Sequence, residues 1–90
     1  MTEKIIKGIN LDMRSIALFA QTAGKFTSEI NIIVDERSAN AKSIMGIMSL
    51  NFIYDKPVKI TARGEDEKQA ITALSSFMAR KANFNGNKFN

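Results

Sequence analysis

The alternation of apolar and polar residues predicts four strands. Apolar side chains alternate with polar ones over residues 29–34 and 58–63, with the period of two that a half-buried strand requires. Residues 3–9 mix isoleucines with lysines and end near a glycine and an asparagine, which predicts a short first strand. Residues 38–41 follow a polar turn at 35–38 and are predicted to be the return strand of a hairpin.

Three further segments are predicted to be helices. Over residues 13–26 the apolar positions have the i, i+3, i+4, i+7 spacing of an amphipathic helix. Over residues 42–50, Ser43 precedes an apolar run, and a serine in that position caps a helix by accepting a backbone N–H bond. After Gly64, three acidic residues favour the start of a third helix, since the helix dipole stabilises negative charge there.

The predicted element order is β-α-β-β-α-β-α. Such an order allows the helices to cover one face of a four-stranded, mainly antiparallel sheet, the α+β arrangement called an open-faced sandwich. We expect residues 1–82 to form this single domain. Residues 83–90 are rich in asparagine and lack any hydrophobic period, so we expect them to be a frayed tail.

Composition removes several classes of function. The chain of 90 residues contains no cysteine, which excludes disulfides, thiolate nucleophiles and sulfur-ligated zinc. It also contains no histidine, so Ser-His and Cys-His nucleophilic schemes are excluded. We therefore expect neither a metal nor a cofactor, and a binding protein rather than an enzyme.

The distribution of charge argues against nucleic acid and membrane partners. The formal net charge is +4, but the lysines and arginines are interspersed with acidic residues and are not clustered with aromatic ones. Residues 1–7 contain no apolar run long enough for a signal peptide or a membrane span. We expect a cytoplasmic protein that contacts neither nucleic acid nor membrane directly.

One segment carries a specific resemblance. Residues 42–50 read Lys-Ser-Ile-Met-Gly-Ile-Met-Ser-Leu, which resembles the regulatory-serine segment of the bacterial HPr family, and especially of its histidine-lacking member, the catabolite repression HPr. The sequence Lys-Phe-Thr-Ser at residues 25–28 and the sequence Arg-Gly-Glu-Asp-Glu at residues 63–67 extend the resemblance. It covers the chain from the first predicted strand to the last predicted helix.

The resemblance implies a role for Ser43 and its neighbours. In the family, the matching serine is phosphorylated by an ATP-dependent HPr-serine kinase, and the product is a corepressor for a catabolite-control transcription regulator. By resemblance, Ile44, Met45 and Met48 form an exposed apolar patch that both partners contact, and methionine suits a surface that must repack. The alternatives are that Ser43 is a plain helix cap and that the apolar side chains are core, as we expect for Ile47 and Leu50.

A second segment departs from the family. The family's active-centre motif Gly-Ile-His-Ala-Arg-Pro-Ala is replaced by Asn-Leu-Asp-Met-Arg-Ser-Ile at residues 10–16, so that Asp12 occupies the position of the phosphate-carrying histidine. A free carboxylate repels an incoming phosphoryl group, so we expect no histidine-type phosphorelay. We expect either Asp12 or Ser15 to cap the following helix, and favour capping over catalysis for Asp12. Arg14 keeps the family's arginine and is a candidate partner contact, with a solvated surface arginine as the alternative.

Two other functions remain open from the sequence. One is a divergent phosphocarrier of the phosphotransferase system in which Asp12 accepts the phosphoryl group and Arg14 steadies it. The other is a protein that binds a metabolic enzyme without any phosphorylation, since a carboxylate at position 12 supplies permanent negative charge. The sequence does not distinguish a monomer from a strand-exchanged dimer.

Overall fold

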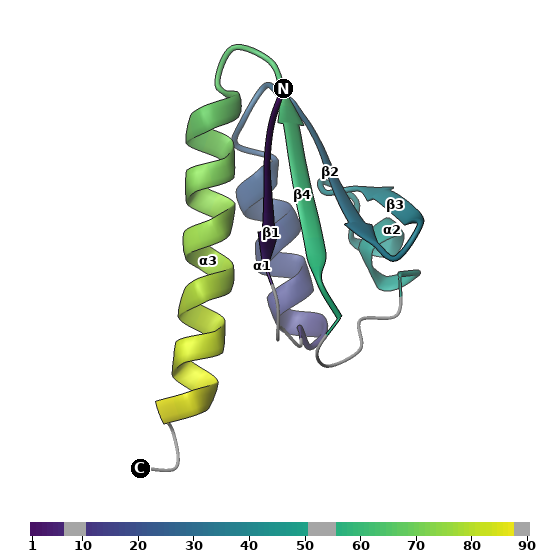
Figure 1. Cartoon of the computed structure of the whole chain (residues 1–90). Helices are drawn as coiled ribbons and strands as arrows, with labels where there is room; N and C mark the ends of the chain where they lie inside the picture. Colours follow the sequence, from purple (N-terminus) through teal and green to yellow (C-terminus); the bar gives the residue numbers. More distant parts are fainter. Residues whose placement is uncertain (7–10, 51–55, 88–90) are drawn as a thin grey trace.

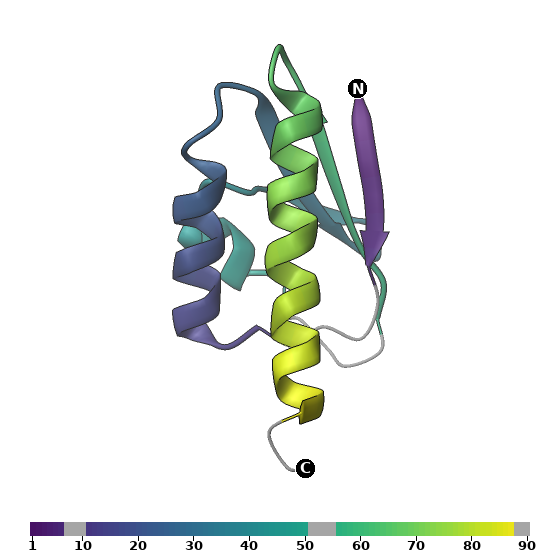
Figure 2. The ribbon, with the colours of Figure 1, turned by 90° about the vertical axis from the view of Figure 1, so that its left-hand side faces the viewer.

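The computed structural model describes residues 1–6, 11–50 and 56–87 of the chain, and the backbone alone from residue 81 onward. It is a four-stranded sheet with three helices on one side (Figures 1 and 2). The elements are β1 (Thr2–Ile6), α1 (Met13–Ala23), β2 (Glu29–Val34), β3 (Arg37–Asn40), α2 (Ile44–Met48), β4 (Val58–Arg63) and α3 (Glu67–Asn87). The predicted open-faced α+β sandwich is confirmed.

The strands follow the spatial order β1-β4-β2-β3. All three neighbouring pairs are antiparallel, so β1 and β3 form the two edges of the sheet. In the central pair, Ile30 lies opposite Ala62 and Ile32 lies opposite Ile60. These residues are buried because the period of two places them on the face that the helices cover.

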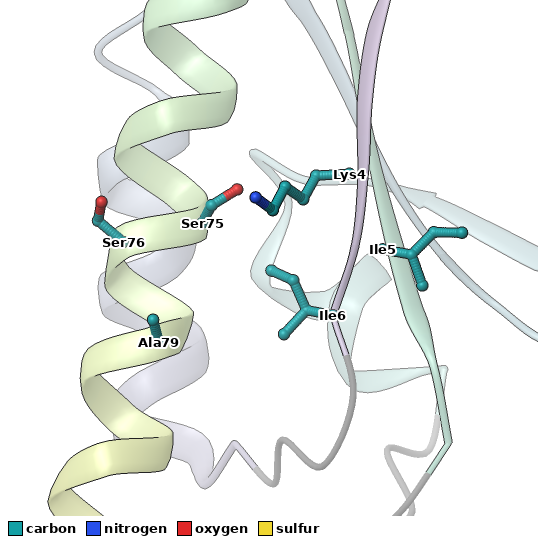
Figure 3. Close-up of a pocket in the computed structure, with 6 residues that line it drawn as sticks. All are labelled: Lys4, Ile5, Ile6, Ser75, Ser76 and Ala79. Atoms are coloured by element: carbon teal, nitrogen blue, oxygen red, sulfur yellow. The ribbon is translucent and has the colours of Figure 1, made fainter.

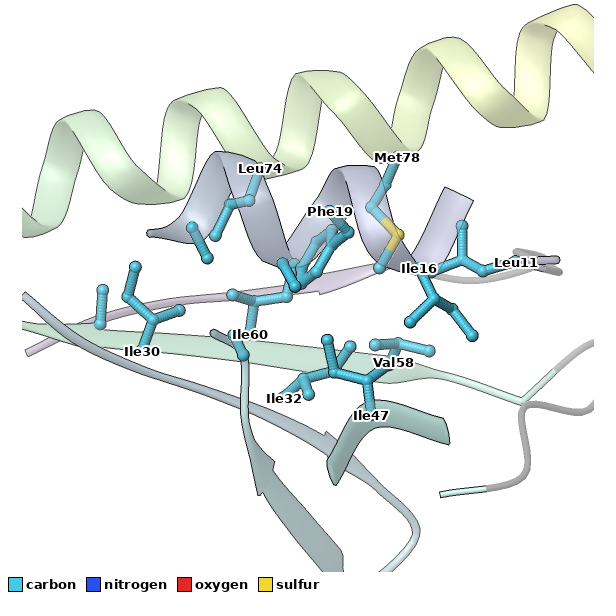
Figure 4. Close-up of a cluster of buried hydrophobic side chains, with 14 of the residues drawn as sticks. Leu11, Ile16, Phe19, Ile30, Ile32, Ile47, Val58, Ile60, Leu74 and Met78 are labelled. Atoms are coloured by element: carbon cyan, nitrogen blue, oxygen red, sulfur yellow. The ribbon is translucent and has the colours of Figure 1, made fainter. Parts of the chain in front are cut away.

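One hydrophobic core fills the space between the sheet and the helices (Figure 4). Its largest fully buried side chains come from both layers: Phe19, Ile30, Ile32, Ile47, Ile60, Leu74 and Met78. The α1 ring of Phe19 meets the half-buried ring of Phe77 from α3 edge to face, with centroids 5.9 Å apart. The apolar stripe predicted within residues 13–26 is therefore buried.

Several element boundaries differ from the sequence prediction. The predicted helix over 13–26 ends at Ala23, because the N–H groups of Lys25 and Phe26 donate to carbonyls three residues back and tighten the last turn. The β2–β3 turn is shorter than predicted, because Asp35 adopts a left-handed φ of 58° and reverses the chain at once. Residues 7–9 of the predicted first strand lie outside the described residues.

Residues 83–87 belong to the segment that the sequence predicts to be a frayed tail. Helix α3 continues through them to Asn87, whereas residues 88–90 lie outside the described residues. Once a helix is established, each further residue adds a backbone hydrogen bond. Glycine in a helix is about 1 kcal/mol less favourable than alanine, and asparagine has a smaller penalty. These penalties do not end helix α3 within residues 83–87.

The start of α3 is bonded to the loop before β2. The Asp66 carboxylate accepts hydrogen bonds from the backbone N–H of Thr27 at 2.9 Å and of Ser28 at 3.0 Å, and from both hydroxyls of these residues. Gly64 has a φ of 152°, and a Cβ there would lie 2.6 Å from the Ser28 hydroxyl oxygen. A glycine is therefore required for this close approach.

Candidate functional site

Ser43 is the N-cap of α2. Its backbone is extended, with φ of −108° and ψ of 114°, and its Oγ accepts a hydrogen bond from the Gly46 N–H at 3.0 Å. Two hydrogen bonds to Asn40 hold the turn before Ser43. The Asn40 side-chain oxygen accepts one from the Lys42 N–H at 2.8 Å, and the Asn40 carbonyl oxygen accepts the other from the Ser43 N–H at 3.0 Å. The predicted cap is confirmed, and Ser43 is half-buried.

Gly46 leaves room beside this hydroxyl. A Cβ at position 46 would lie 3.2 Å from the Ser43 Oγ and 3.4 Å from the Ala39 Cβ. Both contacts would be tight, so a larger residue at position 46 would crowd the hydroxyl. The glycine within the apolar run thus keeps the serine in its capping position.

The apolar residues of α2 divide between core and surface. Ile47 is fully buried, and Leu50, just after the helix, is also buried. The exposed fractions of Ile44, Met45 and Met48 are 42%, 82% and 40%. These three residues, called the apolar patch below, are exposed as the sequence predicts, and the alternative that they are core residues is excluded.

Two exposed apolar residues on α1 were not identified from the sequence. Met13 and Leu18 are 64% and 43% exposed, and α1 packs against α2. Met13 follows Asp12 at the position where the family motif has alanine, and that exchange of a small residue for a large apolar one was the available signal. Leu18 lies outside the buried stripe of α1, so helical periodicity marks it as exposed.

Lys42 places a positive charge next to the capping serine. Its Nζ donates a hydrogen bond to the Phe26 carbonyl oxygen at 2.8 Å. This bond joins the segments 25–28 and 42–50, two of the three segments that carry the family resemblance. The side chain is exposed, so the ammonium group stays accessible to solvent and to anions.

Asp12 has the same structural role at the start of α1. Its Oδ1 accepts a hydrogen bond from the Ser15 N–H at 2.8 Å, and its carbonyl oxygen accepts from the Ile16 N–H at 2.9 Å. Ser15 is buried inside the first turn. Of the two candidate caps, the structure confirms Asp12.

Arg14 lies in the first turn of α1, and its side chain is exposed. Within the described residues no hydrogen bond joins it to Ser43. The two predicted site residues therefore lie on α1 and at the start of α2, two helices that pack against each other.

Among the described residues the structure contains neither a candidate metal site nor a helix that could span a membrane. Nowhere in that part of the chain do three or more acidic side chains, the only available ligands of this type, come together to hold a metal ion. None of the helices described here combines the length and apolar character needed to cross a bilayer.

Comparison with known proteins identifies related chains. A family model described as the PTS HPr component phosphorylation site matches residues 2–80. The phosphocarrier protein HPr of Buchnera aphidicola is 45% identical over 75 residues, which are 83% of this chain and 88% of that protein. The HPr-like protein Crh of Halalkalibacterium halodurans is 44% identical over 71 residues, which are 79% of this chain and 84% of that protein.

A solved structure is similar over nearly the same range. The crystal structure of HPr-C-His from Thermoanaerobacter tengcongensis superposes with a TM-score of 0.84 at 44% sequence identity. The match covers 92% of this chain and 97% of that one. The chain is thus similar in sequence to a phosphocarrier and to an HPr-like protein at almost equal identity, and similar in fold to HPr.

Proposed function

The chain belongs to the HPr family, and from this premise we propose that it is a regulator phosphorylated on Ser43 rather than a histidine phosphocarrier. One observation carries the proposal. The Ser43 hydroxyl is a helix cap at the surface, and the residues that follow it form the exposed apolar patch. Ser43 thus offers a hydroxyl that a kinase can modify, directly before an apolar surface that a partner can contact.

The local structure tolerates a phosphate. Ser43 already directs its oxygen toward the Gly46 N–H, and a phosphate at a helix start interacts favourably with N–H groups and the dipole. The Lys42 ammonium is adjacent in sequence and accessible. Phosphorylation should therefore change the charge of the surface while leaving the fold intact.

The partners proposed are an HPr-serine kinase and phosphatase and a catabolite-control transcription regulator. The apolar patch supports this proposal because the Met45 side chain is large and apolar, yet 82% exposed, so it contributes little to the core and remains available to a partner. Phosphoserine would add charge-assisted hydrogen bonds to the apolar contact. Arg14 is the proposed additional contact from α1, and the protein would act in the cytoplasm without itself touching nucleic acid.

The absence of histidine supports the second half of the proposal. A phosphoryl group carried on nitrogen is transferred readily in both directions, whereas an aspartyl phosphate is a mixed anhydride of different reactivity. The Asp12 carboxylate is also used as the cap of α1. Its replacement of histidine therefore favours a structural and electrostatic role.

The proposal is tested by incubating the protein with ATP and an HPr-serine kinase and locating the phosphate by mass spectrometry. We expect one phosphate on Ser43 and none in Ser43→Ala. Ser49→Ala is the matched control, since Ser49 is an exposed serine at the other end of α2, and it should be labelled normally. Labelling that survives in Ser43→Ala would contradict the proposal.

The phosphocarrier alternative is favoured by the 45% identity to a phosphocarrier HPr. In that case Asp12 would accept phosphate from phosphoenolpyruvate through the upstream enzyme of the phosphotransferase system. The resulting acyl phosphate would be cleaved by hydroxylamine and would be missing in Asp12→Asn. We expect no such label.

A further inference from the structure

A groove lies between the edge strand β1 and helix α3, on elements that contribute nothing to the apolar patch. Its volume is about 470 Å³, and it is lined by Lys4, Ile5, Ile6, Ser75, Ser76 and Ala79 (Figure 3). This volume lies within the range of about 300–1,000 Å³ that is typical of small-molecule sites. The groove is therefore large enough for a small organic ligand.

A lysine faces the helices from β1. Thr2 donates a hydrogen bond to Glu67 of α3 at 2.7 Å, which shows that this side of β1 faces α3. Lys4 and Ile6 follow at intervals of two and point to the same side, whereas Ile5 points away (Figure 3). The charged end of Lys4 is thereby directed into the groove rather than away from the molecule.

The group that Lys4 faces is a buried hydroxyl. The Ser75 Oγ is buried and, within the part of the chain that the structure describes, has no hydrogen-bond partner. The Lys4 ammonium and the Ser75 hydroxyl point toward one another, but no hydrogen bond joins them (Figure 3). Buried hydroxyls are almost always hydrogen-bonded, and an acceptor placed between these two groups would receive hydrogen bonds from both the ammonium and the hydroxyl.

We propose that the groove binds a small monocarboxylate with a short aliphatic chain. The carboxylate would accept hydrogen bonds from the Lys4 ammonium and the Ser75 hydroxyl, and the chain would lie over Ile6 and Ala79. One cation and one hydroxyl match a single negative charge, whereas a phosphate dianion calls for more donors. The exposed Lys4 side chain is flexible enough to move aside for entry.

The inward direction of Lys4 has a second explanation, which involves no ligand. An inward-directed charge on an edge strand hinders pairing with a strand from another chain. In that case Lys4 would need no ligand, and no carboxylate would bind in its vicinity. The two explanations differ in one measurable property, saturable binding.

The test is a titration of the isotope-labelled full chain with hexanoate, followed by NMR of the methyl groups. We expect saturable shifts of the Ile6 and Ala79 methyl signals, and no comparable shifts with the uncharged hexanamide or with inorganic phosphate. Lys4→Gln should weaken binding by about tenfold or more, as expected for a charge-assisted hydrogen bond. Lys68→Gln is the matched control, since Lys68 is exposed on α3 outside the groove lining, and it should bind normally.

Ser75→Ala provides an independent variant. It should also weaken hexanoate binding, whereas Thr72→Ala, which removes an exposed hydroxyl of α3 outside the groove lining, should not. The proposal is overturned if hexanoate causes no saturable shift, if hexanamide or phosphate shifts the same methyl signals equally, or if neither Lys4→Gln nor Ser75→Ala changes the affinity. None of these outcomes depends on whether Ser43 is phosphorylated.

Discussion

Helices α2 and α3 both begin with polar side chains, but the two starts are joined to the rest of the molecule in different ways. At α3, Asp66 accepts hydrogen bonds from Thr27 and Ser28, about forty positions earlier in the chain, and Glu67 accepts from Thr2 and from the Met1 ammonium group. At α2, the Ser43 hydroxyl accepts a hydrogen bond from its own helical turn. The carboxylates at the start of α3 connect distant segments, whereas the Ser43 cap is local and its neighbour Lys42 is bonded to the Phe26 carbonyl.

The difference separates a structural role at α3 from the proposed regulatory role at α2. Hydrogen bonds from Ser28 and Thr27 lower the pKa of Asp66 to about 2, and those from Thr2 and Gly64 lower the pKa of Glu67 to about 2. These carboxylates therefore stabilise the fold in their charged forms. The start of α2 has no comparable set of contacts to distant segments among the described residues, so its charge can change without disturbing them.

The largest effect on stability is expected at the buried side of α2. If the start of the helix contributes little, α2 must be anchored by Ile47, which is fully buried. Ile47→Ala should lower the free energy of unfolding by about 2–5 kcal/mol, measured by urea denaturation. Met48→Ala, in the same helix but 40% exposed, is the control and should lower it much less. Equal losses would show that α2 is not anchored in this way.

The next largest effect is expected at the start of α3. Asp66→Asn removes the charge that its four donor groups stabilise and should lower the midpoint of urea unfolding at pH 7. Because the folded pKa is below the ordinary value of 3.8, this stabilisation is complete above about pH 4 and is lost as the pH falls toward 2. The curves of the wild type and the variant should therefore converge in acid.

Glu65→Gln is the control for that experiment. Glu65 is an exposed neighbour with the same change from carboxylate to amide. Its substitution should leave the midpoint at pH 7 and its pH dependence close to those of the wild type. A constant difference between Asp66→Asn and the wild type from pH 7 to pH 2 would contradict the explanation by charge.

A smaller effect is expected at the local caps. Ser43→Ala and Asp12→Ala each remove one capping acceptor and should each lower the free energy of unfolding by about 1 kcal/mol. A loss at Ser43 as large as that of Ile47→Ala would show that Ser43 is a structural element of the fold. The contrast between α2 and α3 would then fail.

The smallest effect on stability is expected at the apolar patch. Met45→Ser should change the free energy of unfolding by no more than about 0.5 kcal/mol, since an exposed side chain loses little burial. It should nevertheless weaken binding of the phosphorylated protein to its regulator by about tenfold or more, as an interface hot spot does. Ile5→Ser changes another exposed apolar residue, 58% exposed on β1, and is the control that should bind normally. Unchanged binding by Met45→Ser would remove the patch from the proposal.

Much of this fold could be predicted from hydrophobic periodicity. The stripe in α1 and the alternation in β2 and β4 identified the buried residues, because burial follows directly from the period of each element. Boundaries were less predictable. The end of α3 depends on the continuation of an established helix, and the β2–β3 turn depends on the left-handed backbone of Asp35.

The candidate site, like the fold, was predicted only in part from the sequence. The serine cap and the exposed methionines followed from position and resemblance. The contact of Asp66 with Thr27 and Ser28 was not predicted, because the acidic run beside Gly64 indicated only a favourable helix dipole. Long-range hydrogen bonds of this kind depend on tertiary packing, which no local pattern encodes.

The central claim is that phosphate on Ser43 turns the start of α2 into a binding surface. The most direct test is the affinity of a purified catabolite-control regulator for the protein before and after phosphorylation, measured by calorimetry with kinase-treated Ser43→Ala as control. We predict binding at least tenfold tighter for the phosphorylated protein and no change for Ser43→Ala. Equal affinity with and without the phosphate would contradict the claim and favour a partner that binds independently of phosphorylation.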